Sequence, residues 1–523
     1  MMFVRLWKEM RQLGPTFLVV NLILLALGLF SHFTIENPNH EAYLLFSAWG
    51  LCVVFVIGVS LLSVLLYGNE FSFNTLDFLL AQGISRGRIW TEKILALWIL
   101  LTATYVSFSI GIWIIDDRAE FVPRLSANMD ELVRAGFIGG PLLIFAVSGA
   151  APLLTLYLRQ THTAFWLFVF SPALIYIGAL VIYVFLVILG LRISIEFTHF
   201  PGPLILVFLS GFALFRWSFR RFEGLEIRPG ISGSETISKE WVILPKVSMD
   251  ILLPNSAGSS PRLFAKEMRL QRVGFVLATL MVFAWGVSYA MVKVVLPDAI
   301  WEESGFINSI PELAIVLKVI SVNALLFALP MIFGCDAFAQ ERNLGVEPWA
   351  LSQPKSRLSQ WSIKFEAAMI PALVGAIVAT IMSDTWNHMV LSPQATGLDD
   401  GLRAVMGPHE WNLWTPLLLF SICFYTSSFA RGSIQAFLYA LGIFVATVYM
   451  VTVGRYSLHS IDIPLRAIEG LLDYPGFGFL FPVCLLFLLF SYSNFRARQD
   501  FTSSHFVPQV VAWVIAIGCF SMA

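Results

Sequence analysis

The sequence predicts an all-α polytopic membrane protein of about 12 transmembrane helices, arranged as two parallel six-helix repeats. First, 58% of its 523 residues are hydrophobic and only 13% are charged, which is too apolar for a soluble globular protein. Second, the apolar residues form runs long enough to cross a bilayer, about 17 to 25 residues each. Third, one polar stretch occurs twice, at equivalent points of the two halves.

Residues 1–13 predict a short amphipathic entry helix on the membrane surface, with its charged residues on the face opposite the apolar one. Its tetrapeptide Lys-Glu-Met-Arg returns just before the first apolar run of the second half. Because that copy lies far from the N-terminus, we interpret the first run as a retained span and not as a signal peptide. The charged residues of the two predicted entry helices are Lys8, Glu9 and Arg11, and Lys266, Glu267 and Arg269.

Twelve apolar runs have the length of a membrane span, six in each half. The tail Val507–Phe520 is apolar but short, so it is either a surface helix or an extra membrane helix, and we favour the membrane helix. The predicted spans are Thr16–Phe33, Tyr43–Tyr67, Ile94–Ile115, Phe137–Tyr157, Thr163–Leu191, Pro203–Phe219, Gly274–Leu296, Leu313–Phe333, Phe365–Met382, Leu413–Phe429, Ile434–Val453 and Phe477–Tyr492.

Six spans is an even number, so the two halves are expected to be parallel repeats. Alternate loops carry most of the Lys and Arg, which by the positive-inside rule places the N-terminus and both copies of the polar stretch in the cytoplasm. The expected location is the plasma membrane of a bacterium. The predicted domains are a first permease half (1–221), a cytoplasmic linker rich in Gly, Ser and Pro (222–261), a second half (262–500) and an apolar tail (501–523).

The duplicated polar stretch covers residues 69–93 and 340–364. Seven of 25 aligned positions are identical, where average composition gives roughly one or two. In the first copy, apolar residues at helical spacing followed by Gly83 predict a short cytoplasmic helix. The Glu near the start of each copy stands where a span leaves the membrane, so it can pair with a nearby Arg or cap the next helix. The identical pairs are Glu70/Glu341, Leu80/Leu351, Gln82/Gln353, Ser85/Ser356, Arg86/Arg357, Trp90/Trp361 and Lys93/Lys364.

This stretch resembles the loop between the second and third spans of export-type (type-2) permeases of the ATP-binding cassette (ABC) transporters. That loop runs Glu, three residues, Gly-Thr-Leu, two residues, Leu-Leu, two residues, Pro, any residue, Ser-Arg. The first copy departs from it at Asn74 and Gly83, and the second at Val346 and Glu347. The matching residues are Glu70, Thr75, Leu76, Leu79, Leu80, Ser85 and Arg86, and Glu341, Gly345, Leu351, Pro354, Ser356 and Arg357.

The resemblance implies that each stretch contains a coupling helix seated in a separate ATPase subunit. Residues from Phe73 to Gly83 and from Leu344 to Gln353 would contact two ABC ATPase subunits, and the Ser-Arg pairs would anchor the ends of the stretches. Pro348 implies that the second coupling helix starts later than the first. The sequence contains no GxxxxGK[ST] motif, so the chain is expected to bind no nucleotide itself. The other expected partners are the lipid bilayer and a substrate that the sequence does not identify; no nucleic acid is expected.

Two other classes remain open at this point. Facilitator-type secondary carriers also have six plus six parallel spans, and Gly83–Arg88 faintly resembles their short basic motif; however, the predicted spans carry almost no carboxylates for ion coupling. A membrane-bound enzyme would need a catalytic or metal-binding constellation, and the eight His residues are isolated. The five Cys residues have no paired spacing, so neither disulfides, a metal nor a cofactor is predicted.

Overall fold

A computed structural model of the chain shows two compact units, and all the secondary-structure elements that it describes are helices. The first unit comprises Met1–Pro172 with Ser194–Ile243, and the second comprises Ala173–Ile193 with Leu244–Ala523. The structure describes residues 2–33, 40–72, 75–81, 84–119, 123–158, 161–170, 202–225, 259–290, 318, 321–343, 347, 355–389, 411–430, 432–459, 481–497 and 508–515.

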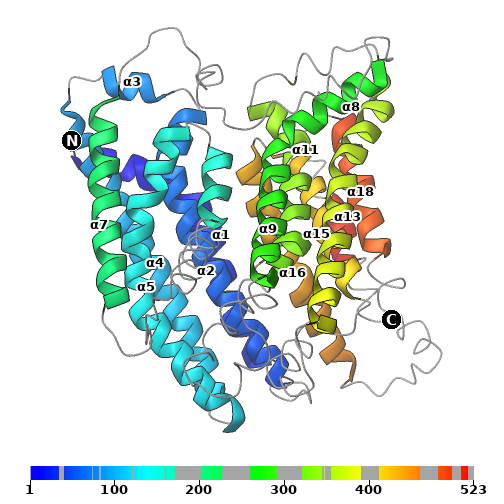
Figure 1. Cartoon of the computed structure of the whole chain (residues 1–523), viewed down its shortest axis with the longest axis horizontal. Coiled ribbons are helices and arrows are strands. Elements are labelled where there is room, and N and C mark those ends of the chain that lie inside the picture. Colours follow the sequence, from blue (N-terminus) through cyan, green and yellow to red (C-terminus); the bar gives the residue numbers. More distant parts are fainter. Residues whose placement is uncertain are drawn as a thin grey trace. The chain divides into compact units, whose positions relative to one another are not determined.

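The first unit is a bundle around the paired helices α1 and α4, and α2 packs on both (Figure 1). Helix α5 packs on α2, α4 and α7, which closes the bundle. The short helix α3 runs across one end of the unit. The bounds are α1 Met2–Phe33, α2 His40–Ser72, α3 Leu76–Ala81, α4 Arg86–Ala119, α5 Pro123–Leu158 and α7 Gly202–Glu223.

The second unit is a bundle around α11 and α15. Helices α13 and α16 pack on both, and α18 packs on α15 and α13. The oblique helix α8 lies at one end and contacts α13 (Figure 1). The bounds are α8 Ser259–Leu270, α9 Arg272–Ala290, the π-helical turn η4 Ala324–Ala328, α11 Leu329–Asn343, α13 Arg357–Met389, α15 Trp411–Ser427, α16 Ser433–His459 and α18 Phe481–Arg496, with residues 508–515 also helical.

Seven of the described helical segments are long and apolar enough to cross a membrane, as expected for a multi-pass membrane protein. The shorter apolar segments Thr415–Ser427, Ser433–Thr447 and Phe481–Arg496, in α15, α16 and α18, coincide with the last three predicted spans, and α7 coincides with the sixth. Most of the fifth predicted span and most of the linker 222–261 lie outside the described residues. The seven segments are Val4–Phe30, Gly50–Phe71, Arg86–Ile115, Gly139–Leu158, Arg272–Ala290, Ser321–Arg342 and Arg357–Thr385.

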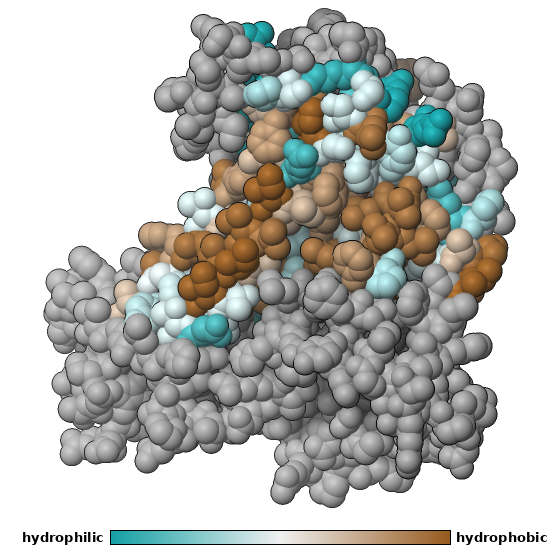
Figure 2. Space-filling view, turned by 90° about the vertical axis from the view of Figure 1, so that its right-hand side faces the viewer, coloured by the Kyte–Doolittle hydropathy of each residue, from teal (hydrophilic) through white to brown (hydrophobic). Residues whose placement is uncertain are grey.

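The surface of the second unit has the character expected of a lipid-facing bundle. Figure 2 shows large hydrophobic patches on this face, with the most hydrophilic residues more numerous toward the top of the view. Along α13, large apolar side chains are exposed at helical spacing, including Ile370, Leu373, Ile377 and Ile381. Because exposed aliphatic residues on one helix face are favourable in hydrocarbon and unfavourable in water, this face is suited to contact lipid.

Small residues let the helices approach closely in both units. A Cβ atom added to Gly28 of α1 would lie 2.9 Å from the Cα of Gly111 in α4. A Cβ atom added to Gly334 of α11 would lie 3.0 Å from the carbonyl oxygen of Phe420 in α15. Larger residues at these positions would push the helices apart, so we expect these glycines to maintain the packing around which each bundle is built.

The N-terminus differs from the sequence prediction. Residues 1–13 were expected to form an entry helix separate from the first span, but α1 is a single helix that continues through Pro15 into the span. In the second unit, by contrast, α8 and α9 are separate helices joined at Gln271. The proline ends no helix here because it removes only one backbone hydrogen bond, and a long apolar helix in a packed bundle tolerates that loss.

Candidate functional site

A buried ionic cluster joins three helices of the first unit. Lys93 of α4 places its Nζ 2.6 Å from Oε2 of Glu9 in α1 and 3.0 Å from Oε1 of Glu70 near the end of α2. The Lys93 side chain is 1% exposed, and both glutamates are buried. The hydroxyl of Thr75 donates a hydrogen bond to the other Glu70 oxygen. The cluster therefore joins the N-terminal part of the chain to both ends of the first polar stretch.

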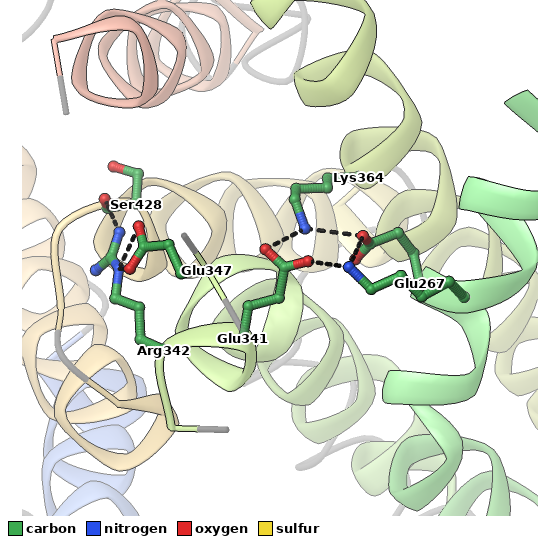
Figure 3. A network of polar contacts seen from close by, with 7 residues as sticks. Glu267, Glu341, Arg342, Glu347, Lys364 and Ser428 are labelled. Carbon is green, nitrogen blue, oxygen red and sulfur yellow. Dashed lines mark hydrogen bonds and ion pairs between the residues drawn. The ribbon is translucent and has the colours of Figure 1, made fainter. Parts of the chain in front are cut away.

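A second cluster of the same kind joins three helices of the second unit. Lys364 of α13 lies 2.9 Å from Glu267 of α8 and 2.9 Å from Glu341 near the end of α11. Figure 3 shows the Glu341 carboxylate between this lysine and a second ammonium. That ammonium belongs to Lys266, which lies 2.6 Å from Glu341 and 3.7 Å from Glu267. Two lysines here neutralise two glutamates.

An aromatic ring lies beside each buried ammonium group. Lys93 Nζ is 5.8 Å from the ring centroid of Tyr67, and Lys364 Nζ is 5.7 Å from that of Phe338. Each of these rings packs against an aromatic ring from the end of its unit's last long helix: Tyr67 lies 5.3 Å from Phe222, and Phe338 lies 5.3 Å from Phe495. The face of an aromatic ring attracts a cation, so these rings add to the stabilisation of the buried lysines.

The repeated tryptophans also occupy similar environments. Trp90 of α4 packs against Phe215 and Phe219 of α7, with ring centroids 4.6 and 5.0 Å away. Trp361 of α13 packs 5.7 Å from Tyr492 of α18 and donates a hydrogen bond to Ser491 at 3.4 Å. In both units the helix that begins within the polar stretch, α4 or α13, thus packs on α7 or α18 through its tryptophan.

Because their charged side chains are buried, these clusters are sensitive to substitution. Transferring an ion out of water is costly, and a close opposite charge offsets this cost only when the geometry is good. Burial raises the pKa of the Glu267 carboxyl and Glu341 raises it further, while Lys364 opposes the increase. The proton on this group is therefore held more tightly than on an ordinary glutamate.

The short helix predicted after Glu70 is present as α3. Leu76, Leu79 and Leu80, which were expected to contact an ATPase, are buried against the chain itself. Phe78 is the exposed apolar residue of this helix, with 73% of its surface accessible. An amphipathic helix cannot direct these three leucines both inward and outward, so a partner that docks here would meet Phe78.

The remaining predicted site residues divide into two groups. Ser356 stands at the N-cap of α13, where its hydroxyl accepts a hydrogen bond from the Ser359 backbone N–H at 3.2 Å. Ser85 also precedes its helix, α4, where its backbone carbonyl accepts hydrogen bonds from the N–H groups of Arg88 and Ile89, and Arg86 donates to the backbone carbonyl of Glu223 at the end of α7. Arg357 begins α13. Phe73, Gly345, Leu351 and Pro354 lie outside the described residues, as does Pro348 with the expected later start of the second helix.

In residues 1–13 the charged residues were expected on the face opposite the apolar one; Lys8 and Arg11 are exposed, but Glu9 is buried in the first ionic cluster. In α8, Arg269 is exposed and Glu267 is buried in the second cluster. Each of these two glutamates is buried because it meets a lysine from a helix distant in sequence. Helical periodicity takes no account of such a partner.

From the sequence, Lys93 and Lys364 were assigned no role, and the glutamates were given two alternatives, an arginine partner or a helix cap. The sequence did contain a signal: both copies of the polar stretch end on a lysine, and both carry a glutamate near their start. Among the described residues, no three His, Cys, Asp or Glu side chains form a group suited to a metal ion. Comparisons with family models, curated proteins and solved structures find no match to this chain.

Proposed function

We propose that this chain is the membrane permease of an ATP-driven exporter, with two six-span halves whose polar stretches dock separate ABC ATPase subunits. The observation that carries the proposal is the pair of ionic clusters. In each unit, one lysine ties the start of the polar stretch, at Glu70 or Glu341, to the segment before the first apolar run, which is the N-terminal part of α1 with Glu9 or α8 with Glu267. A force applied to the stretch would reach two spans and this segment at once.

Similar packing in the two units supports a two-repeat arrangement. The contacts of α2 with α4 and α5 have counterparts between α11 and both α13 and α15. The contact of α5 with α7 has its counterpart between α15 and α18. This pattern fits twelve spans formed by two parallel copies of one unit, with the N-terminus and both stretches in the cytoplasm.

The proposed mechanism assigns different tasks to different residues. Phe78 provides the apolar contact for one ATPase subunit, because it is the large exposed side chain of α3. The buried leucines Leu76, Leu79 and Leu80 hold α3 on the unit, so that α3 moves together with the helices beneath it. Rigid transfer of motion requires that the base of the stretch be fixed, and the ionic clusters provide this.

Affinity purification from the native membrane in mild detergent tests the proposal. The tag is placed on the N-terminus, and the expected result is a stoichiometric soluble ATPase with a phosphate-binding loop. Phe78→Glu should reduce the recovery of that ATPase, and Arg11→Glu, a charge change on an exposed residue of α1, serves as the control. Purification of the chain alone, with transport that follows an ion gradient, would contradict the exporter and favour a secondary carrier.

A further inference from the structure

A second polar network extends from the second stretch in the opposite direction. Figure 3 shows Arg342, the residue after Glu341, pointing away from the ionic cluster toward Ser428. Its guanidinium donates hydrogen bonds to the backbone carbonyls of Ser428 and Ala430, just beyond α15. The Nε atom also lies 3.4 Å from a carboxylate oxygen of Glu347, within the second stretch. Arg342 therefore holds the second stretch against the end of α15.

The network continues from Ser428 to the C-terminal tail. Asn494 of α18 donates to the Ser428 hydroxyl at 3.1 Å, and Gln509 donates to the Asn494 side-chain oxygen at 2.7 Å. The hydroxyl of Tyr425 donates to the Gln509 side-chain oxygen at 3.0 Å. Gln509 lies in helical residues 508–515 and is buried. The polar contacts of the tail and those of Arg342 thus meet at Ser428, the first through its hydroxyl and the second through its backbone carbonyl.

The position of Gln509 is informative because the rest of the tail helix is apolar and partly exposed. Val511, Val514 and Ile515 face outward, so only Gln509 places a polar side chain among the polar groups of the unit. A buried amide is costly unless its donor and acceptor are both satisfied, and here they are. The tail helix is therefore fixed in place by a specific contact, in addition to its apolar contacts.

The first unit has different residues at the corresponding places. In the gapless alignment, Arg342 corresponds to Phe71, and Glu347 corresponds to Leu76. Leu76 is buried by packing and cannot form an ion pair. The polar connection to the tail is thus a property of the second stretch. Where the second stretch has Glu347, the first has the buried apolar side chain of Leu76.

We propose that the C-terminal tail helix positions the second polar stretch, acting through Gln509, Asn494, Ser428 and Arg342. The tail and the stretch share one hydrogen-bonded network, so a change at either end shifts the equilibrium at the other. The functional consequence rests on the proposed function: the tail would regulate the docking of one ATPase subunit and leave the other unaffected. The positioning itself does not depend on which partner docks.

Hydrogen–deuterium exchange on the purified full chain in lipid nanodiscs tests this proposal without any ATPase. Gln509→Met keeps the length of the side chain and removes both of its hydrogen bonds. We expect the amides of residues 340–355 to exchange several-fold faster, while residues 69–85 of the first stretch stay unchanged. Val514→Ala, on the exposed face of the same helix, is the matched control and should change neither segment.

Ser428→Ala breaks the network midway without altering the tail, and it tests the proposal if Gln509→Met does not fold. The same local acceleration is expected, and the double variant should show no more acceleration than the larger single effect, because both changes break one connection. Unchanged exchange at 340–355, or equal acceleration at 69–85, would overturn the positioning role. The exchange experiment contains no ATPase, so that result would not bear on the exporter proposal, which the affinity purification tests separately.

Discussion

The ammonium of Lys364 lies 2.9 Å from the carboxylate of Glu267, although the two residues are 97 positions apart in the sequence. The lysine is the last residue of the second polar stretch, and the glutamate belongs to α8, the helix that directly precedes α9. Lys93 and Glu9 form the corresponding pair in the first unit, 84 positions apart, at 2.6 Å. In each unit this contact joins the polar stretch to the helical segment that carries the glutamate, α8 or the N-terminal part of α1.

Replacing the lysine of either cluster should destabilise its unit, but by different amounts. Lys93→Met leaves two buried glutamates without their cation, and breaking such a pair costs about 3–5 kcal/mol. Lys364→Met should cost less, because Lys266 still lies 2.6 Å from Glu341. Thermal unfolding in detergent measures both, with Arg11→Met on the surface as a control that stays within about 0.5 kcal/mol. Equal losses for the two lysines would contradict the role given to Lys266.

The stability contribution of Glu267 should depend on pH. Its carboxyl has a pKa above the usual 4.5 because of burial, so the folded chain binds this proton more tightly than the unfolded chain. The stabilisation from that proton is complete below the unfolded pKa and is lost as pH rises through the folded value. The melting temperature of the wild type, relative to Glu267→Gln, should therefore fall as pH rises from 4.5. If the melting temperature of the wild type instead rises with pH relative to that of Glu267→Gln, pairing with Lys364 outweighs burial.

The two faces of α3 should respond differently to substitution. Phe78→Ala removes an exposed ring, so it should leave the melting temperature nearly unchanged while weakening the recovery of an ATPase. Leu79→Ala removes a buried side chain and should reduce the free energy of unfolding by about 2 kcal/mol. Differential scanning fluorimetry and co-purification separate these effects. Loss of stability with Phe78→Ala would mean that the ring packs against the chain itself.

Ser356 should stabilise the start of α13 through its side chain. Ser356→Ala removes the acceptor for the Ser359 N–H and should cost about 0.5–2 kcal/mol, whereas Ser356→Asp keeps an acceptor at the N-cap and should restore most of the loss. The free energy of unfolding of the three proteins measures this. If Ala and Asp behave alike, the hydroxyl does not act as a cap.

Much of the fold follows from local sequence. Apolar runs placed the helices, and the composition indicated a membrane protein, because a bilayer requires long stretches without charge and internally satisfied backbone groups. The helix α3 was predicted because leucine spacing and Gly83 are local signals. The same spacing could not show which side of α3 is covered: Leu76, Leu79 and Leu80 are buried, and Phe78 is exposed.

The sequence by itself determined the helical class, the position of most helices and the residues that repeat. Only the tertiary structure decided which of the repeated residues meet: Glu9 with Lys93, and Glu267 with Lys364 and Glu341. It also decided that Gln509 contacts Asn494 near the second polar stretch. The physical reason is that helix periodicity is a property of neighbouring residues, whereas the pairing of a buried charge depends on which distant helix packs beside it.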